Sequence, residues 1–182
     1  MPPIAYADLA GPNGQDDNMG GTTQRVFFAP VGDFLAIQKP TVSTTYASKS
    51  EITTAHTFLT GKCFKKAYCT MDKGKVDAKS QGETDGKSFK MEGEFFLPGS
   101  LAEAHGFASI CKNDNFILEV EMPDSDVNGY IQVGTEMFPC KISPEFTSAT
   151  NSGGVRGYTF KYEAMTATVN VYSGAVSVTP AV

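Results

Sequence analysis

The chain has 182 residues, of which 41% are hydrophobic and 19% charged, and it contains no Trp. This length suits one ordinary to large domain, and the composition is that of a folded chain rather than a disordered one. The net charge of −5 argues against stable DNA binding, because proteins that bind duplex DNA usually present a basic stripe to the phosphates.

The first unit of the chain, residues 1–23, is rich in Gly, Pro, Asn and Asp and lacks hydrophobic periodicity, which predicts an extended N-terminal arm. Its beginning has neither the basic nor the apolar region of a signal peptide. No apolar stretch in the sequence approaches the roughly 20 residues that cross a bilayer, so we expect no membrane partner. Residues 24–182 are predicted to form a single β-sandwich domain.

Regular structure is predicted to begin with strands at 24–30 and 34–37. Residues 41–60 then contain ten Ser or Thr residues in twenty positions, which is typical of a long loop. Ile52 and Phe58 have the same parity, so part of this segment could be strand. Long loops in compact domains are often functional, which makes 41–60 a candidate interaction segment.

The next two predicted strands are 63–71 and 88–97, separated by a polar stretch around 72–88. The second of them alternates cleanly, as a half-exposed strand does. One predicted face carries Phe89, Met91 and Gly93, and the other carries Lys90, Glu92 and Glu94.

The four cysteines, Cys63, Cys69, Cys111 and Cys140, are interpreted as free thiols of a reducing cytoplasm. Cys63 and Cys69 are an even number of positions apart, so on one strand they share a face and are expected in the core.

A single helix is predicted over 100–112. Ser100 and Glu103 have the spacing of a capping box, in which each side chain binds the other residue's backbone N–H. The apolar stripe consists of Leu101, Ala104, Ala108 and Cys111.

The remainder is predicted to be β structure, beginning with strands at 116–122 and 130–133 around a turn that contains Asn128 and Gly129. Further strands are expected at 136–142, 145–149, 156–163, 168–172 and 176–179. The fold class is therefore mainly β, a β-sandwich or open barrel with one flanking α-helix and long loops.

The turn before the strand at 130–133 resembles the first half of a calcium loop, with candidate ligands Asp124, Asp126 and Asn128. The twelfth loop position should be Glu but is Thr135, and the flanks read as strands rather than helices. An ordinary Asn-Gly hairpin is therefore favoured over a metal site.

No catalytic motif is visible. His56 and His105 are the only histidines, and neither has a nucleophile motif beside it. The glycines before Ser88 lack the spacing of a phosphate-binding loop. We therefore predict neither an enzyme nor a cofactor, with an unrecognised hydrolase as the least favoured alternative.

The order of features carries one resemblance to a known family. A Gly-rich arm, a Ser/Thr-rich loop, a strand ending in Phe-Leu-Pro-Gly99, a central helix and an Asn-Gly hairpin succeed one another. The segments 134–142 and 152–162 follow, and the chain closes with Val-Tyr-Ser-Gly174. Over about residues 20–175 this pattern resembles the tail tube (major tail) proteins of tailed bacteriophages.

The resemblance implies a virion structural protein whose subunits form rings, usually hexameric, that stack into the conduit for DNA ejection. It implies contacts with the subunit itself, with the tape measure protein and with tail terminator or baseplate proteins, while DNA only passes through the lumen. The implied location is the virion tail, after synthesis in the host cytoplasm. An acidic lumen would repel the phosphates.

Carried over to this sequence, the resemblance makes residues 41–60 the inter-ring loop and residues 1–23 an arm that reaches neighbouring subunits, with the hairpin around 72–88 as a competing loop candidate. The candidate self-assembly residues are Thr41, Ser43, Tyr46, Lys49, Glu51, Ile52, Thr54 and Phe58. Two alternatives stay open: another virion part, such as a head decoration or head–tail joining protein, or a β-sandwich module that binds carbohydrate or calcium.

Overall fold

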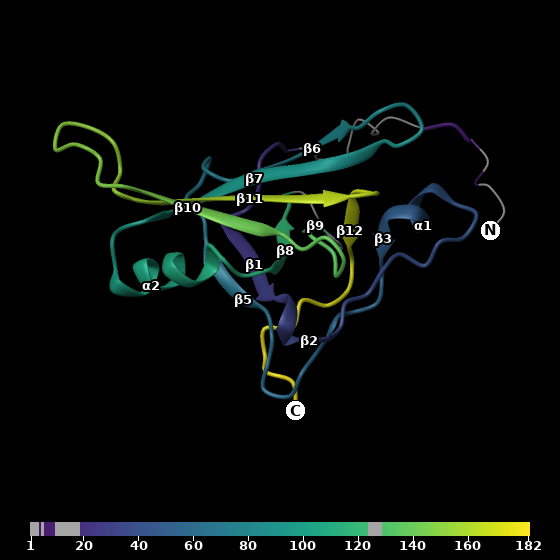
Figure 1. Ribbon diagram of the computed structural model, residues 1–182, viewed down its shortest axis with the longest axis horizontal. Coiled ribbons are helices and arrows are strands. Elements are labelled where there is room, and N and C mark those ends of the chain that lie inside the picture. Colours follow the sequence, from purple (N-terminus) through teal and green to yellow (C-terminus); the bar gives the residue numbers. More distant parts are fainter. Residues whose placement is uncertain (1–3, 5, 10–18, 124–128) are drawn as a thin grey trace.

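The computed structural model describes residues 4, 6–9, 19–123 and 129–182 (Figure 1). It is mainly β, with two main sheets, a small two-stranded sheet and two α-helices in the described residues. One cluster of buried side chains draws on both main sheets and on the longer helix, so the sheets pack face to face as a sandwich. Neither sheet closes into a barrel, which confirms the sandwich and removes the barrel alternative.

The larger sheet has six strands in the order β3-β12-β9-β8-β1-β5. These strands are β1 (Arg25–Pro30), β3 (Glu51–Ile52), β5 (Lys65–Tyr68), β8 (Phe116–Glu121), β9 (Tyr130–Val133) and β12 (Asn170–Tyr172). Neighbouring strands are antiparallel except β3 and β12, which run parallel with Glu51 opposite Val171. Every residue of β8 is buried, because both faces of this sheet are covered.

The smaller main sheet has four strands in the order β10-β11-β7-β6. These are β6 (Lys75–Gln81), β7 (Ser88–Pro98), β10 (Lys141–Thr147) and β11 (Gly157–Thr166), all antiparallel. The predicted alternation of β7 is confirmed: Met91, Gly93 and Phe95 are buried. The opposite face of this sheet is turned away from the sandwich.

The core between the sheets is built from aromatic and aliphatic side chains. Phe95 and Phe160 stack with ring centroids 5.0 Å apart, and both are almost fully buried. Burying an aromatic side chain of this size stabilises the fold by roughly 1.5–3 kcal/mol. All four cysteines are free, as the sequence predicts, and all four are buried, which the sequence analysis expected of Cys63 and Cys69.

Gly93 shows how closely β7 and β11 approach. The Tyr162 ring lies directly over its Cα, where a Cβ would collide with the ring and with the carbonyl oxygen of Lys75. The Tyr162 hydroxyl donates to that same carbonyl at 2.8 Å, so one tyrosine spans three strands. The missing side chain at position 93 makes this bridge possible.

The other face of the six-stranded sheet is covered by a second, smaller core. The two-stranded sheet of β2 (Phe34–Ala36) and β4 (Thr57–Phe58) lies over it, beside a 3-10 turn at Val31–Asp33. Phe58 and Phe64 pack there against Phe27 and Ala29. The C-terminal segment completes the cover through backbone bonds, including one from Phe64 N to Ser177 O at 3.0 Å.

The long helix α2 (Ala102–Cys111) confirms the predicted element within two residues, but the predicted capping box is wrong. The N-cap residue is Leu101, with no side-chain cap bond. A turn at Gly99, whose φ is 99°, delays the helix, and Ser100 therefore lies before the cap position. Of the predicted stripe, Ala104, Ala108 and Cys111 are buried, whereas Leu101 is exposed.

Several other predicted elements differ. The two strands expected at 136–142 and 145–149 are the single strand β10, which tolerates Pro144 because it is at a sheet edge. The strand expected at 176–179 is irregular chain. The segment 41–60 contains α1 (Tyr46–Ser50), β3 and β4 in addition to loop.

Candidate assembly surfaces

The candidate residues of segment 41–60 divide into two groups. Thr41, Ser43, Tyr46, Lys49 and Thr54 are exposed. Ile52 and Phe58 are buried in their own subunit, where β3 and β4 hold the segment on the body of the molecule. Glu51 is partly buried and accepts a hydrogen bond from the Ser173 hydroxyl at 2.9 Å. Only the exposed group has side chains that can reach another molecule.

The calcium candidates Asp124, Asp126 and Asn128 lie outside the described residues. The strands on either side pair as the hairpin prediction requires, with Glu121 opposite Tyr130. Within the described part of the chain, no group of three His, Cys, Asp or Glu side chains could hold a metal ion.

The outward face of the four-stranded sheet is a mosaic of opposite charges. Its basic residues are Lys75, Lys79, Lys90, Lys141 and Lys161, and its acidic residues are Asp77, Glu92, Glu94, Glu145 and Glu163, as register and alternation place them. Lys90 is the centre: its Nζ lies 2.6 Å from Glu92 and 3.2 Å from Glu163. These carboxylates raise the pKa of Lys90 above its usual value, first through the hydrogen bond to Glu92.

The same sheet has two free edges, β6 and β10. Most of β6 is exposed on both faces, because the β6–β7 hairpin extends past the rest of the sandwich (Figure 1). No strand among the described residues pairs with its outer edge, so that edge presents backbone N–H and C=O groups. The other edge strand, β10, contains Pro144, which has no backbone N–H and so leaves the strand one donor short.

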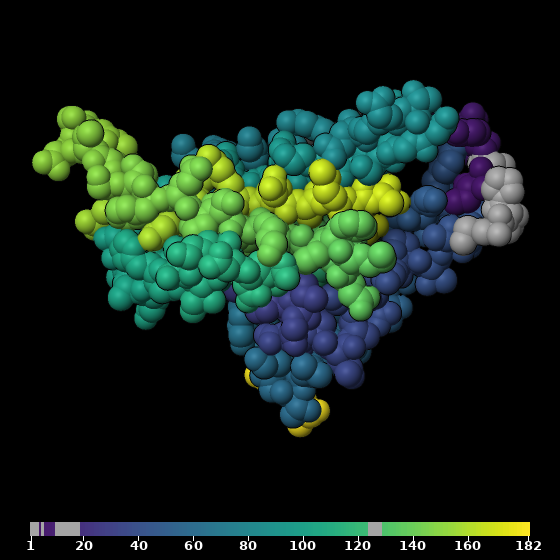
Figure 2. All heavy atoms as spheres, in the orientation of Figure 1, coloured from purple at the N-terminus to yellow at the C-terminus, as the bar shows by residue number. Residues whose placement is uncertain are grey.

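The loop between β10 and β11, residues 148–156, forms a second projection. In the space-filling view it stands away from the body as a finger (Figure 2). Thr150 and Gly153 exchange backbone hydrogen bonds at 3.2 and 3.3 Å, which closes its tip as a turn. Val155 is 62% exposed, an apolar side chain with little cover from its own subunit.

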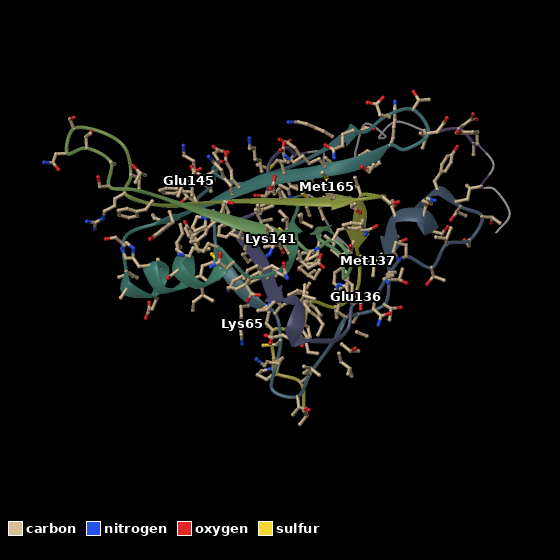
Figure 3. The ribbon with its side chains drawn as sticks, viewed as in Figure 1. Lys65, Glu136, Met137, Lys141, Glu145 and Met165 are labelled. Carbon is tan, nitrogen blue, oxygen red and sulfur yellow. The ribbon has the colours of Figure 1, made fainter. Side chains whose placement is uncertain are left out.

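An apolar groove lies beside β11, and we call it the Met137 groove. It consists of two adjoining hollows of about 440 and 330 Å³ that share Met137 and Phe138. Met137 is 75% exposed and Phe138 is 55% exposed (Figure 3 labels Met137). Four lysines and one acid also line it, namely Lys39, Lys49, Lys90, Lys141 and Glu163.

A buried polar cluster lies beneath the β2–β4 cover. His56 Nε2 is 3.3 Å from Glu119 Oε1 and 3.1 Å from Gln132 Oε1, and the His56 and Glu119 side chains have no exposed surface. Oε2 of Glu119 has no hydrogen-bond partner among the described residues. The His56 ring stacks on Tyr172 with centroids 4.5 Å apart. His56, Glu119 and Gln132 do not line any of the four hollows described around the molecule.

Sequence reasoning missed both the Met137 groove and the His56–Glu119 pair. Met137 and Phe138 fall in a predicted strand, whereas the chain turns there, so these apolar side chains face outward. Glu119 and Glu121 alternate with apolar residues as on a solvated strand face, yet that face is covered. The other histidine, His105, is exposed and lies 2.6 Å from the Tyr158 hydroxyl.

None of the described helices combines the length and apolar character of a membrane span. Comparison of the chain with protein-family models, curated proteins and solved structures finds no match. The surfaces that the fold exposes are therefore the basis for a functional assignment: a charged sheet face, two free strand edges, two projections and an apolar groove.

Proposed function

We propose that this protein is the tail tube subunit of a tailed bacteriophage, which self-assembles into stacked rings that form the conduit for DNA ejection. The proposal begins from the pattern resemblance of the sequence. A second observation in its favour is the four-stranded sheet, which in the described part of the chain ends in an edge strand on each side and carries a charged face opposite the core.

The two free edges are different strands, so a contact between them is heterologous. Pairing of β6 of one subunit with β10 of the next leaves the same two edges free at the ends of the pair. Repetition with a constant rotation closes a ring, in which the four-stranded sheets become one continuous wall. Main-chain hydrogen bonds across each junction supply the affinity.

The charge mosaic suits a wall along which DNA moves. Lysines that face a lumen attract phosphates, but Lys90 and Lys161 are held by carboxylates at 2.6 and 2.7 Å. Because the five basic and five acidic residues of this face balance, a lumen wall formed by it would carry no net charge. A neutral wall lets DNA slide without binding it tightly.

The two projections suit contacts along the tube axis. The β6–β7 hairpin and the finger at 148–156 both extend beyond the sandwich (Figure 1), and segment 41–60 adds the exposed α1. In the proposed tube these parts meet the neighbouring ring, while tape measure, terminator and baseplate proteins are the other expected partners.

The first test is negative-stain electron microscopy of the purified protein at several concentrations, with light scattering alongside. Hollow tubes of uniform width support the proposal. Single rings without stacking favour a head–tail joining or decoration protein. A strictly monomeric protein at high concentration, also after addition of preformed tail ends as initiators, would sink the proposal.

A matched pair of proline variants tests the strand-edge contact. Successive N–H groups of a strand point to opposite sides, so of Asp77→Pro and Ala78→Pro one removes a bond to β7 and the other removes only the outward donor. The variant that keeps the wild-type melting temperature is the outward one, and it should lose ring formation. Normal assembly of that variant would exclude β6 from the contact.

A further inference from the structure

The Met137 groove is an apolar surface with basic surroundings. Met137 and Phe138 expose large apolar side chains next to Met165, which is 43% exposed. The combined volume lies within the range of about 300–1,000 Å³ that is common for ligand pockets. Such a patch on a soluble subunit indicates a contact site.

The charges around the groove select the kind of occupant. Lys49 and Lys141 have no carboxylate partner within ion-pairing distance in the described part of the chain, and Lys141 only donates to the carbonyl oxygen of Asp114 at 3.4 Å. A segment that fits must therefore bring apolar side chains together with negative charge. A basic segment would be repelled.

One segment of this same chain has that chemistry. The first 24 residues contain three acidic residues, Asp8, Asp16 and Asp17, and no Lys or Arg. Tyr6 is 99% exposed and Leu9 is 84% exposed, so both apolar side chains lack cover within their own subunit. The segment Tyr6–Leu9 thus has two apolar side chains with an acid between them.

Within its own subunit this segment is held elsewhere. The Ala7 N–H donates to the Tyr46 hydroxyl at 2.7 Å, and that hydroxyl donates to the Ala7 carbonyl at 3.3 Å. These bonds tie the segment to α1 and leave Tyr6 and Leu9 uncovered. In one subunit the segment therefore does not fill the groove, although the chemistry of the two matches.

We propose that the Met137 groove of one subunit receives the Tyr6–Leu9 segment of a second copy of this chain. Tyr6 and Leu9 enter the two hollows, and Asp8 faces the lysines on the rim. This inference deepens the proposed self-assembly by naming a contact between subunits. The inference rests on the proposed function only where it places this contact in a tube, because two subunits can make the contact without forming a ring.

The test is chemical crosslinking between two single-cysteine variants, Leu9→Cys and Met137→Cys, mixed as purified full-length proteins. The four native thiols are buried, and burial raises the pKa of Cys69, Cys111 and Cys140, so a short bis-maleimide reacts at the new thiols. We expect at least tenfold more crosslinked dimer than in the matched control, which pairs Leu9→Cys with Ile110→Cys. Ile110 is 69% exposed, close to the 75% of Met137, but lies on α2.

Addition of Asp8→Lys to the Leu9→Cys chain should lower the yield severalfold at low salt, and high salt should lower the yield of the pair that keeps Asp8. A yield of crosslinked dimer no greater than that of the control overturns the inference. A double variant, Leu9→Cys/Met137→Cys, gives a second check: crosslinks that form only within single chains also overturn it. If tubes form but the crosslink does not, the proposed function is supported and the arm contact is wrong. If the crosslink forms but rings do not, the arm contact is supported and the tail tube function is wrong.

Discussion

The backbone N–H of Gln38 donates a hydrogen bond to Nδ1 of His56 at 2.9 Å, which holds the buried imidazole in its neutral form. Because Nδ1 accepts, the ring proton is on Nε2, which faces the side-chain oxygens of Glu119 and Gln132. Burial lowers the pKa of His56 to about 4 and raises the pKa of Glu119 well above its usual value. Both shifts favour uncharged side chains beneath the β2–β4 cover.

Replacement of Glu119 by Gln is expected to stabilise the fold at neutral and alkaline pH. Above the ordinary carboxyl pKa of 4.5 the unfolded chain loses the proton that the folded chain keeps, because the folded pKa is raised. The free energy of unfolding of the wild type therefore falls as pH rises, by up to about 1.4 kcal/mol per pH unit, until the folded pKa is reached. Gln does not titrate and removes this loss.

Urea unfolding of both proteins between about pH 5 and 8 measures the difference. Glu145→Gln, a change at a side chain that is 58% exposed, serves as the surface control and should move stability little. An identical pH dependence for wild type and Glu119→Gln would show that Glu119 is ionised inside the folded protein.

His56 should produce the opposite pH dependence, and it is best seen in the Glu119→Gln background. The folded pKa of about 4 lies below the ordinary 6.5, so between these values the unfolded chain binds more protons. Stability is fully present above pH 6.5 and falls by about 3 kcal/mol in total as pH drops to about 4. The test compares the unfolding midpoints of Glu119→Gln and Glu119→Gln/His56→Gln at pH 6.5 and pH 4. An equal loss of stability in the two variants would show that His56 does not cause the pH dependence.

Gly93→Ala is expected to destabilise the protein by about 1–3 kcal/mol, because a Cβ at this position collides with the Tyr162 ring and the Lys75 carbonyl. Gly106→Ala is the matched control. A Cβ there meets nothing within 4 Å, and Ala favours the helix α2, so a gain of about 1 kcal/mol is expected. Thermal unfolding of the two variants should give shifts of opposite sign, and a neutral Gly93→Ala would show that the tyrosine bridge is loose.

Removal of the acids that hold Lys90 should make the charged sheet face bind DNA. Glu92→Gln/Glu163→Gln leaves Lys90 without its two carboxylate partners. The control Glu83→Gln/Asp85→Asn removes two negative charges as well, but from the exposed turn after β6. Gel mobility of duplex DNA at low salt should shift with the first variant only, and less as salt rises. A shift with both variants would assign the effect to net charge.

How far the sequence predicts this molecule depends on whether the deciding contacts are local. The alternation of β7 and the stripe of α2 are local periodicities, and both elements are found within two residues of the prediction. The cap failed because the turn at Gly99, fixed by a bond from its N–H to the Arg156 carbonyl, decides where the helix begins. That bond joins residues far apart in the sequence.

The candidate sites show the same limit. The shared parity of Ile52 and Phe58 allowed for strand in segment 41–60, but nothing near them in the sequence reveals the distant strands with which they pair. The Met137 groove depends on a turn that exposes apolar side chains. The backbone next to this turn is fixed by the bridge between Cys140 and Phe116, which are far apart in the sequence. The succession of short predicted strands was enough to predict a β protein, whereas its surfaces depend on long-range strand register.

The parallel pairing of β3 with β12 has a kinetic consequence. Ser173 bonds to Glu51 across 122 positions, so the outermost strand of the larger sheet finds its neighbour only after nearly the whole chain has left the ribosome. Contacts of such high order slow folding, because a large loop must close before the contact forms. A nascent subunit therefore stays incomplete while it is being made, and synthesis itself delays the moment at which one chain can join another.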